Sequence, residues 1–439
     1  MTERQAMEYI AQLSGLGVVP GLDSIRELCR RLEDPQKKLK FIHVAGTNGK
    51  GSVSTYIASV LQCAGYRVGR YISPVIYEYR ERIQINGRMI SKKALCQGIE
   101  RIKTVCDAMT AEGLPHPTPF EIETALGFLF FMEKGCDIVV LETGMGGLLD
   151  ATNIVENTVV AVLTSISMDH MRYLGDAIEK IAEQKAGVIK RGCAVVSTGQ
   201  SPEVMEVICR RAKELDCPVT AAGADKAEKV HYGLECQRFD LGCRKKLEIT
   251  LAGKYQIENA VLAVEAIDVL GERGFPVSEE QLRRGLRDAE WPGRFTIIKR
   301  HPLFIADGAH NEDAAKRLAE SLTFYFTNRR IIYIMGVLKD KEYEKIIALT
   351  HAYADHIITV TPPENPRALP AYELALEVAK VHPKVTAVDS LEEAVEMSLL
   401  LAGSEDVIIA FGSLSYLGKL MEIAGTTFGK AAKRHGRSK

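Results

Sequence analysis

A glycine-rich stretch directly after a short apolar run has the composition of a phosphate-binding loop. The apolar residues 41–44 lead into AGTNGKGS at residues 45–52, and a helical pattern follows at residues 53–64. In a strand, turn and helix of this kind, backbone N–H groups and the helix dipole can surround an anion. Lys50 would then reach the outer phosphates of a nucleotide, as the lysine of a P-loop does. The predicted nucleotide contacts are Gly46, Thr47, Asn48, Gly49, Lys50, Gly51 and Ser52.

The stretch differs from the common P-loop pattern GxxxxGK[ST]. Gly46 stands four residues before Lys50 instead of six, and Gly51 occupies the position of the usual serine or threonine. A glycine-rich turn that binds nothing is the alternative. The combination of strand, turn, lysine and helix favours the phosphate site.

A carboxylate follows another apolar run. Residues 138–141 form this run, and Glu142 comes next, ahead of a glycine-rich segment. Mg²⁺ prefers hard oxygen ligands and is usually held by one or two carboxylates together with substrate phosphates. Glu142 is therefore a candidate Mg²⁺ ligand, and a capping or surface carboxylate is the alternative.

An α/β fold must position these residues. Short β-branched runs occur at residues 41–44, 138–141, 159–166, 303–305, 331–335, 356–360 and 407–411, with helical segments between them. This alternation predicts buried strands in mostly parallel sheets. It restarts after Arg294, so we expect a P-loop-containing domain at residues 1–295 and a smaller Rossmann-like α/β domain at 296–425. The proline-rich residues 361–370 are predicted to form a loop, and residues 426–439 a solvated basic tail.

Composition narrows the class of protein. The chain has 439 residues and a formal net charge of −1, which argues against nucleic acid as the main partner. No apolar run reaches the length of a membrane span, and the first residues carry charges where a signal peptide would be apolar. The ten cysteines include no CxxC pair, which favours reduced thiols over a zinc site. We expect a cytoplasmic protein without a membrane partner.

The loop AGTNGKGS resembles that of the Mur ligase family, in its folylpolyglutamate and dihydrofolate synthase branch. Further motifs of this branch follow in the same order. They are SP at 73–74, ERI at 81–83, NG at 86–87, TPFE at 118–121, LETGMGGLLDATN at 141–153, TSISMDH at 164–170, IAEQKAG at 181–187, GKYQIENA at 253–260, WPGRF at 291–295, DGAHN at 307–311 and FGSL at 411–414. The resemblance implies a Mur ligase-like fold.

The resemblance also implies an ATP- and Mg²⁺-dependent ligase that forms an amide through an acyl phosphate. A carboxylate needs a better leaving group than oxide, and phosphoryl transfer from ATP supplies one. The acid would be a folate, or also dihydropteroate, and the amine would be L-glutamate. We expect the enzyme to be a monomer.

Metal ligands and catalytic residues follow from the same resemblance. Two Mg²⁺ ions would be held by Ser73, Glu142, His170 and Lys185, with Lys185 carboxylated at Nζ by carbon dioxide. Taken alone, a lysine in a helix is usually a solvated charge, and imidazole is an unusual ligand for Mg²⁺. The predicted catalytic residues are Lys50, His170 and Lys185.

Substrate contacts are implied in both predicted domains. ATP would also contact Asn259, Arg294 and Asp307, since a guanidinium fork suits phosphate oxygens. His310 would lie near the incoming glutamate. The acid would contact Thr118, Pro119, Phe120, Glu121, Leu149, Asp150 and Ala151. Phe120 could stack on a flat heteroaromatic ring, and a place in the hydrophobic core is the alternative.

Three positions depart from the family pattern. Val75 replaces a histidine, Leu148 an arginine and Gln184 a glutamate. Two other functions therefore stay open: a Mur-type ligase for another carboxylic acid, and a nucleotide-binding regulator without ligase activity. Glutamate-dependent release of ADP and phosphate would distinguish a ligase from a regulator.

Overall fold

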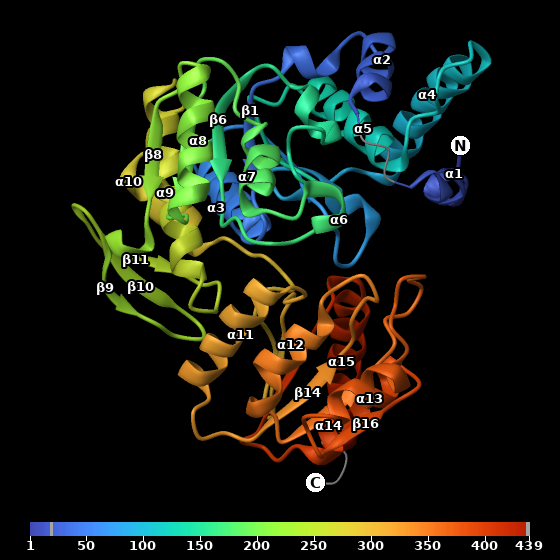
Figure 1. Cartoon of the computed structure of the whole chain (residues 1–439), viewed down its shortest axis with the longest axis vertical. Helices are drawn as coiled ribbons and strands as arrows, with labels where there is room; N and C mark the ends of the chain where they lie inside the picture. Colours follow the sequence, from blue (N-terminus) through green and yellow to red (C-terminus); the bar gives the residue numbers. More distant parts are fainter. Residues whose placement is uncertain (18–20, 436–439) are drawn as a thin grey trace. The chain divides into compact units, whose positions relative to one another are not determined.

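The computed structural model describes residues 1–17 and 21–435, and its contacts divide the chain into two compact units. The N-terminal unit contains Met1–His231, Arg238–Ile249 and Ile257–Ala289. The C-terminal unit contains Tyr232–Gln237, Thr250–Gln256 and the chain from Glu290 onward. Figure 1 follows the chain from blue at its N-terminus to red at its C-terminus. The sequence predicted one domain boundary near residue 295. The C-terminal unit also includes the two short segments Tyr232–Gln237 and Thr250–Gln256, which precede that boundary.

A mostly parallel sheet forms the centre of the N-terminal unit. Its strands are β1 (Phe41–Ala45), β2 (Val68–Tyr71), β3 (Ile83–Ile85), β4 (Arg88–Met89), β5 (Ile138–Glu142), β6 (Thr158–Leu163), β7 (Ala194–Thr198) and β8 (Val219–Ala222), in the order β4-β3-β2-β5-β1-β6-β7-β8. Strands β2, β5, β1, β6, β7 and β8 are parallel, and β3 is antiparallel to both β2 and β4. Because β1 lies between β5 and β6, the loops that follow these three strands meet at one edge.

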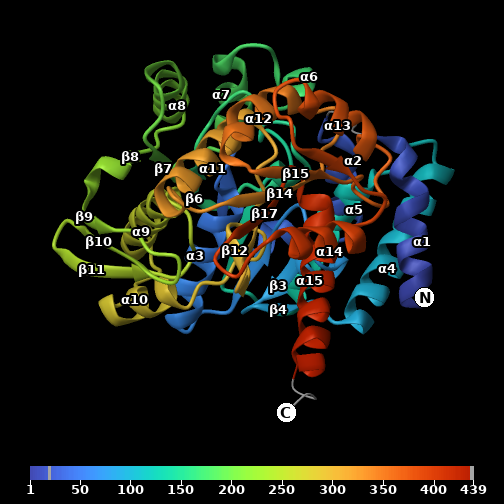
Figure 2. The same cartoon turned by 90° about the horizontal axis from the view of Figure 1, so that it is seen from below.

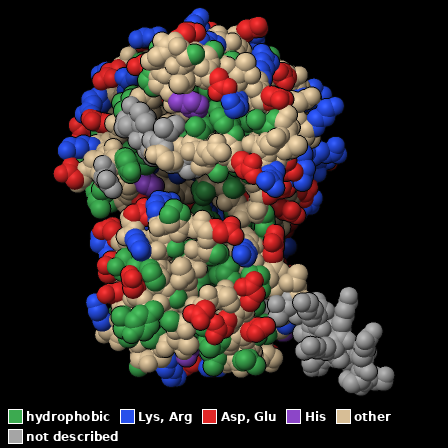
Figure 3. All heavy atoms as spheres, turned by 90° about the vertical axis from the view of Figure 1, so that its right-hand side faces the viewer, with side chains coloured by type: hydrophobic (Ala, Val, Ile, Leu, Met, Phe, Trp, Pro, Cys, Tyr) green, Lys and Arg blue, Asp and Glu red, His purple; other side chains and the backbone are tan. Residues whose placement is uncertain are grey.

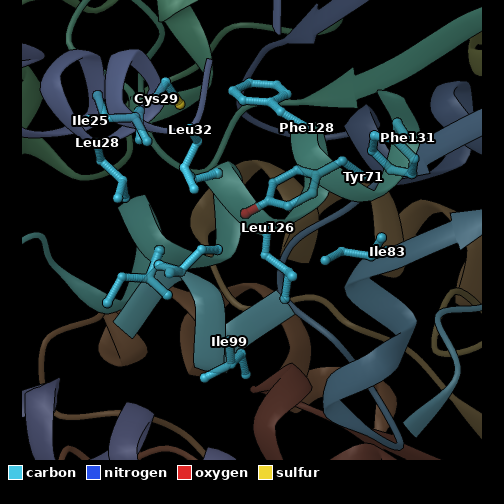
Figure 4. Close-up of a cluster of buried hydrophobic side chains, with 14 of the residues drawn as sticks. Ile25, Leu28, Cys29, Leu32, Tyr71, Ile83, Ile99, Leu126, Phe128 and Phe131 are labelled. Atoms are coloured by element: carbon cyan, nitrogen blue, oxygen red, sulfur yellow. The ribbon is translucent and has the colours of Figure 1, made fainter. Parts of the chain in front are cut away.

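Helices cover this sheet. They are α1 (Glu3–Gln12), α2 (Asp23–Arg31), α3 (Lys50–Cys63), α4 (Lys92–Ala111), α5 (Pro119–Glu133), α6 (Met171–Leu174), α7 (Ile178–Ala186), α8 (Pro202–Glu214), α9 (Gln256–Glu272) and α10 (Glu279–Arg287). Short 3₁₀ helices are η1 (Leu13–Leu16), η2 (Pro35–Lys38), η3 (Tyr79–Arg82), η4 (Ala151–Ile154) and η5 (Ala224–Lys226). Buried side chains of α2, α4 and α5 pack with Tyr71 and Ile83 of the sheet (Figure 4).

The C-terminal unit has its own doubly wound sheet. Its strands are β12 (Thr296–Arg300), β13 (Leu303–Ala306), β14 (Ile331–Met335), β15 (His356–Thr359), β16 (Val385–Ala387) and β17 (Val407–Phe411), in the order β12-β13-β17-β14-β15-β16. Only β12 pairs antiparallel in this described sheet. Its helices are α11 (Glu312–Tyr325), α12 (Tyr343–Thr350), the 3₁₀ helix η6 (His351–Tyr353), α13 (Ala371–Ala379), α14 (Leu391–Leu401) and α15 (Leu414–His435). Figure 2 shows α11 and α12 on one face and α14 and α15 on the other.

Four local predictions need correction. The helix after the glycine loop begins at Lys50, because Gly49 adopts φ 89° and serves as its N-cap. Strand β6 ends at Leu163, since the next residues turn to hydrogen bond the glycine loop. A third sheet of β9 (Ala227–His231), β10 (Gln237–Leu241) and β11 (Arg244–Ile249) was not predicted. Helix α15 runs through much of the predicted tail, in a segment rich in the helix formers alanine and lysine, and residues 436–439 lie outside the described residues.

The hydropathy of the helices, the surface charges and the cysteines can be compared with what the composition predicted. Within the described part of the chain, no helix has the length and hydropathy of a membrane span. Lys and Arg side chains are interspersed with Asp and Glu on the face drawn in Figure 3. All ten cysteines are free thiols. The predicted loop at residues 361–370 lies between β15 and α13.

The packing of α10 on α3 gives a test of this fold. A side-chain carbon at Gly285 would lie 2.4 Å from Cα of Val60, so the two helix backbones are in direct contact. We expect Gly285→Ala to destabilise the N-terminal unit by about 1–3 kcal/mol, measured by chemical denaturation. Gly271→Ala is the control, because no atom lies within 4 Å of that position. Equal stability of both variants would contradict the helix contact.

Candidate functional site

The glycine loop is enclosed by two polar side chains. Gly46 has φ 154°, and a side-chain carbon there would lie 1.8 Å from Thr164 Oγ1. A side-chain carbon at Gly49 would lie 2.6 Å from Asn259 Oδ1, which comes from α9. Both positions therefore require glycine. The structure brings Asn259, predicted to bind ATP, against the loop.

Hydrogen bonds fix the loop to the segment after β6. The Thr47 amide donates to Ser165 O at 2.7 Å, and its hydroxyl donates to Ser167 O at 3.0 Å. The Ser167 amide donates back to the Thr47 hydroxyl at 3.0 Å. The Asn48 amide donates to Ser165 O at 3.4 Å. The Thr47 side chain thus stabilises the loop itself, a role that its sequence position did not indicate.

Two lysines converge on one carbonyl of this loop. Lys50 Nζ donates to Gly46 O at 3.0 Å and to Thr47 O at 3.1 Å. Lys185 Nζ, from α7, donates to the same Gly46 O at 2.7 Å. Lys185 is only 3% exposed, so the alternative of a solvated lysine is wrong. Burial lowers the pKa of Lys185 well below its ordinary value, and the charge of Lys50 lowers it further.

The remaining part of α3's first turn lies beside Lys50. Gly51 and Ser52 are both buried there. A helix N-terminus carries amide groups that no preceding turn can satisfy, and these attract anions. The predicted contacts at residues 46–52 therefore belong to the glycine loop and the first turn of α3.

Buried carboxylates follow β5 at the same edge of the sheet. Glu142 is the last residue of β5, pairs with Val44 of β1, and is 3% exposed, so it is not a surface carboxylate. Asp150 accepts hydrogen bonds from Met145 N at 2.8 Å, Thr152 N at 3.1 Å and Thr152 Oγ1 at 2.5 Å. Burial raises the pKa of Asp150, and these hydrogen bonds oppose that shift.

The loop between Glu142 and Asp150 packs directly on α7. A side-chain carbon at Gly147 would lie 2.7 Å from the Gln184 carbonyl oxygen. The Leu148 amide donates to that oxygen at 2.6 Å. Two of the positions that depart from the family pattern are therefore neighbours, next to Lys185. Leu148 and Leu149 are exposed, and Ala151 is buried.

The predicted acid-side residues at the start of α5 are partly structural. Thr118 caps α5, and Glu121 Oε2 accepts from the Thr118 amide at 2.7 Å and from its hydroxyl at 2.8 Å. Pro119 occupies the first helical turn. Phe120 makes an edge contact with Tyr71, with ring centroids 6.2 Å apart, and its ring lies over Gly144. Phe120 packs against the core while staying partly exposed.

Two predicted metal ligands, Ser73 and His170, are less buried than Glu142 and Lys185. Ser73 lies in the loop after β2 and is half-buried. His170 has φ 52° at the start of α6, and its side chain is 39% exposed, so it is not a core residue. Its Nε2 lies 3.9 Å from a carboxylate oxygen of Asp169. Within residues 1–17 and 21–435, no group of three or more His, Cys, Asp or Glu side chains is arranged to hold a metal.

The C-terminal unit contributes a second cluster, built around Asp307. This buried carboxylate follows β13 and accepts hydrogen bonds from Tyr255 Oη, Phe295 N and Ala309 N, each at 2.9 Å. Burial raises the pKa of Asp307, whereas the charge of Arg294 lowers it. A side-chain carbon at Gly308 would lie 1.8 Å from Arg294 Nη1.

His310 belongs to the same cluster, because its Nδ1 lies 2.7 Å from Gly308 O. Arg294, Asp307 and His310, from the motifs WPGRF and DGAHN, therefore lie together. Tyr255 was missed as a partner of Asp307. Its motif, GKYQIENA, marked the segment but not this contact.

Two family models together match most of the chain. The family model described as Mur ligase middle domain matches residues 44–267, and the Mur ligase, glutamate ligase domain matches residues 293–414. The dihydrofolate synthase/folylpolyglutamate synthase of Bacillus subtilis is 36% identical over 424 residues, covering 95% of this chain and 98% of the relative.

Solved structures are similar along nearly the whole chain. Mycobacterium tuberculosis folylpolyglutamate synthase, complexed with ADP and AMPPCP, has a TM-score of 0.87 and 30% identity, covering 96% of this chain and 99% of the other. Escherichia coli FolC, in complex with DHPP and ADP, has a TM-score of 0.82 and 29% identity, covering 96% and 98%. The predicted α/β fold is confirmed. The chain belongs to the Mur ligase family, in its branch of folylpolyglutamate and dihydrofolate synthases.

Proposed function

We propose that this chain joins L-glutamate to the carboxylate of a folate, with ATP and Mg²⁺, and that dihydropteroate is a second acid substrate. The observation that carries the proposal is that Lys50 and Lys185 both donate to Gly46 O. This carbonyl lies in a loop whose positions 46 and 49 require glycine. The names of the related enzymes support the choice of acid and amine.

The chemistry has two steps. An oxygen of the acid's carboxylate attacks the γ-phosphorus of ATP, the bond to ADP breaks, and an acyl phosphate forms. The glutamate amine then attacks the acyl carbon, inorganic phosphate leaves, and a proton is released from the nitrogen. The glycine loop and Lys50 hold the phosphates, since positioning and charge neutralisation dominate phosphoryl transfer. Asn259, Arg294 and Asp307 are proposed as further ATP contacts.

The residues present fit Mg²⁺. Glu142 offers a hard, buried carboxylate, and Mg²⁺ is commonly bound by one or two carboxylates with substrate phosphates and water. When bound, the ions neutralise the repulsion between the γ-phosphate and the acid's carboxylate. Ser73 would supply a hydroxyl oxygen. His170 is proposed from the family alone, because imidazole is an unusual ligand for this ion.

Lys185 fits carboxylation by carbon dioxide. In its neutral form this buried amine can attack carbon dioxide, releasing one proton and leaving a carbamate on Nζ. The lowered pKa of Lys185 favours that neutral form. The carbamate would give the second Mg²⁺ its oxygen ligand. On the acid side, Phe120, Leu149, Asp150 and Ala151 are proposed as contacts of the folate, with Thr118, Pro119 and Glu121 shaping that surface, and His310 is proposed near the glutamate.

The activity itself is tested with a panel of acids. We expect release of ADP and phosphate only when L-glutamate and a folate, or dihydropteroate, are both present. A UDP-muramoyl acid is the control for other ligases of the family. Nucleotide hydrolysis that needs no amine, or an amide formed only with the muramoyl acid, would contradict the proposed function.

Lys50 tests the phosphate loop. We expect Lys50→Ala to lower kcat by about 10²–10³-fold, because removing one preorganised donor to developing charge typically has this effect. Circular dichroism should show an unchanged fold. Lys213→Ala, at an exposed position in the last turn of α8, is the matched control and should keep full activity. Full activity of Lys50→Ala would show that the loop assignment is wrong.

Lys185 is tested by ¹³C NMR with labelled bicarbonate. We expect one carbamate signal that weakens as the pH falls through the lowered pKa of Lys185, because only the neutral amine reacts. Lys185→Ala should remove the signal. Lys190→Ala is the control, since burial lowers the pKa of Lys190 to about 8 and this residue follows shortly after α7 in the chain. Loss of the signal in Lys190→Ala alone would reassign the carbamate.

A further inference from the structure

A chain of hydrogen bonds connects the strand before the glycine loop to Asp150. His43 Nε2, on β1, lies 2.9 Å from Thr152 Oγ1, and that hydroxyl donates to Asp150 Oδ1 at 2.5 Å. His43 and Thr152 are fully buried, and Asp150 is 6% exposed. The three residues come from β1, from η4 and from the loop that follows β5. None of the motifs assigned a role to His43 or Thr152.

The direction of these hydrogen bonds is fixed by chemistry. A threonine hydroxyl has one hydrogen, and here it is donated to the Asp150 carboxylate, which can only accept. The oxygen of Thr152 must therefore accept from His43, so His43 carries its proton on Nε2. Burial lowers the pKa of His43 to about 3, which keeps the ring neutral. The chain thus runs from donor His43 through Thr152 to acceptor Asp150.

Stability alone does not explain a histidine at this place. Its neighbours in β1, Ile42 and Val44, are apolar and fully buried. His43 Nδ1 is also buried, and among the described residues it has no hydrogen-bond partner. A buried polar atom left without a partner destabilises a protein. An apolar residue of similar volume would avoid this penalty, but it would leave Thr152 without a donor.

What the histidine provides is orientation of the Asp150 carboxylate. Oδ1 accepts from the Thr152 hydroxyl and amide, and Oδ2 accepts from Met145 N. His43 stops the Thr152 hydroxyl from turning, because its Nε2 proton occupies a lone pair of that oxygen. His43 also lies on the strand that leads into the glycine loop at Gly46. The carboxylate is therefore positioned relative to the strand that carries the phosphate site.

We propose that His43 is a positioning residue for the acid substrate, acting through Thr152 on Asp150. This inference rests on the proposed function, which places Asp150 against the folate. His43 touches neither substrate directly. Its removal should weaken binding of the acid and leave nucleotide binding intact, because the contacts of the glycine loop do not include His43.

The test compares substitutions that break the chain with others that keep it. We expect His43→Leu and Thr152→Val to raise KM for the acid about tenfold, with KM for ATP changed less than about twofold. A tenfold change corresponds to about 1.4 kcal/mol, within the range for a hydrogen bond to a charged group. His43→Gln keeps a donor near Nε2, and Thr152→Ser keeps the hydroxyl. Both should stay within about threefold of the parent.

Two further readouts separate positioning from a general structural role. The thermal midpoint of His43→Leu should equal or exceed that of the parent, because the unpartnered Nδ1 is removed. The double variant His43→Leu/Thr152→Val should bind the acid no worse than the weaker single variant, since both break one chain. If His43→Leu does not fold, the Thr152 pair decides on the same criterion.

Three outcomes would overturn the inference. They are an unchanged KM for the acid in the chain-breaking variants, an equal rise in KM for ATP, and failure of Thr152→Ser to restore the acid KM. Absence of folate-dependent turnover in the parent enzyme is a different result, because it would reject the proposed function itself.

Discussion

The carbonyl group of Gly46 is the point on which the N-terminal site depends. It accepts hydrogen bonds from Lys50 and from Lys185, and a side chain at Gly46 would collide with Thr164. The position of β1 between β5 and β6 explains why these groups meet. Strand β6 supplies the segment that anchors the loop, and β5 ends in Glu142. The site is therefore a consequence of strand order, with the chemistry carried by the loops at one edge.

The charged groups around Lys185 shift its pKa in opposite senses. Two amines lie against one carbonyl, and burial together with the charge of Lys50 lowers the pKa of Lys185. The carboxylates of Asp150 and Asp169 act in the opposite sense. An arriving phosphate would be attracted by the positive charge of Lys50.

Sequence patterns predicted the features formed by residues close together in the chain. They did not predict contacts between residues far apart in sequence. The glycine loop, its strand and its lysine are contiguous in sequence, so their spacing indicated their role. Thr118 and Glu121 are also close in sequence, but the same motif can indicate either a substrate contact or a helix capping box. The hydrogen bonds in the structure show that they form a capping box. Contacts such as Tyr255 with Asp307 join residues 52 positions apart, which no local periodicity encodes. Strand β6 was predicted too long because apolar and hydroxyl residues both favour extended chain.

Each of the two units contains a buried aspartate whose carboxyl group is held by hydrogen bonds. Asp150 and Asp307 each follow a strand of a parallel sheet, and each is buried with three hydrogen-bond donors. Burial alone would favour the protonated form of both carboxyls, and the donors act against that effect. A carboxylate held by three fixed donors cannot turn or lose its hydrogen bonds without a large penalty. Both aspartates are therefore suited to hold a partner in one orientation.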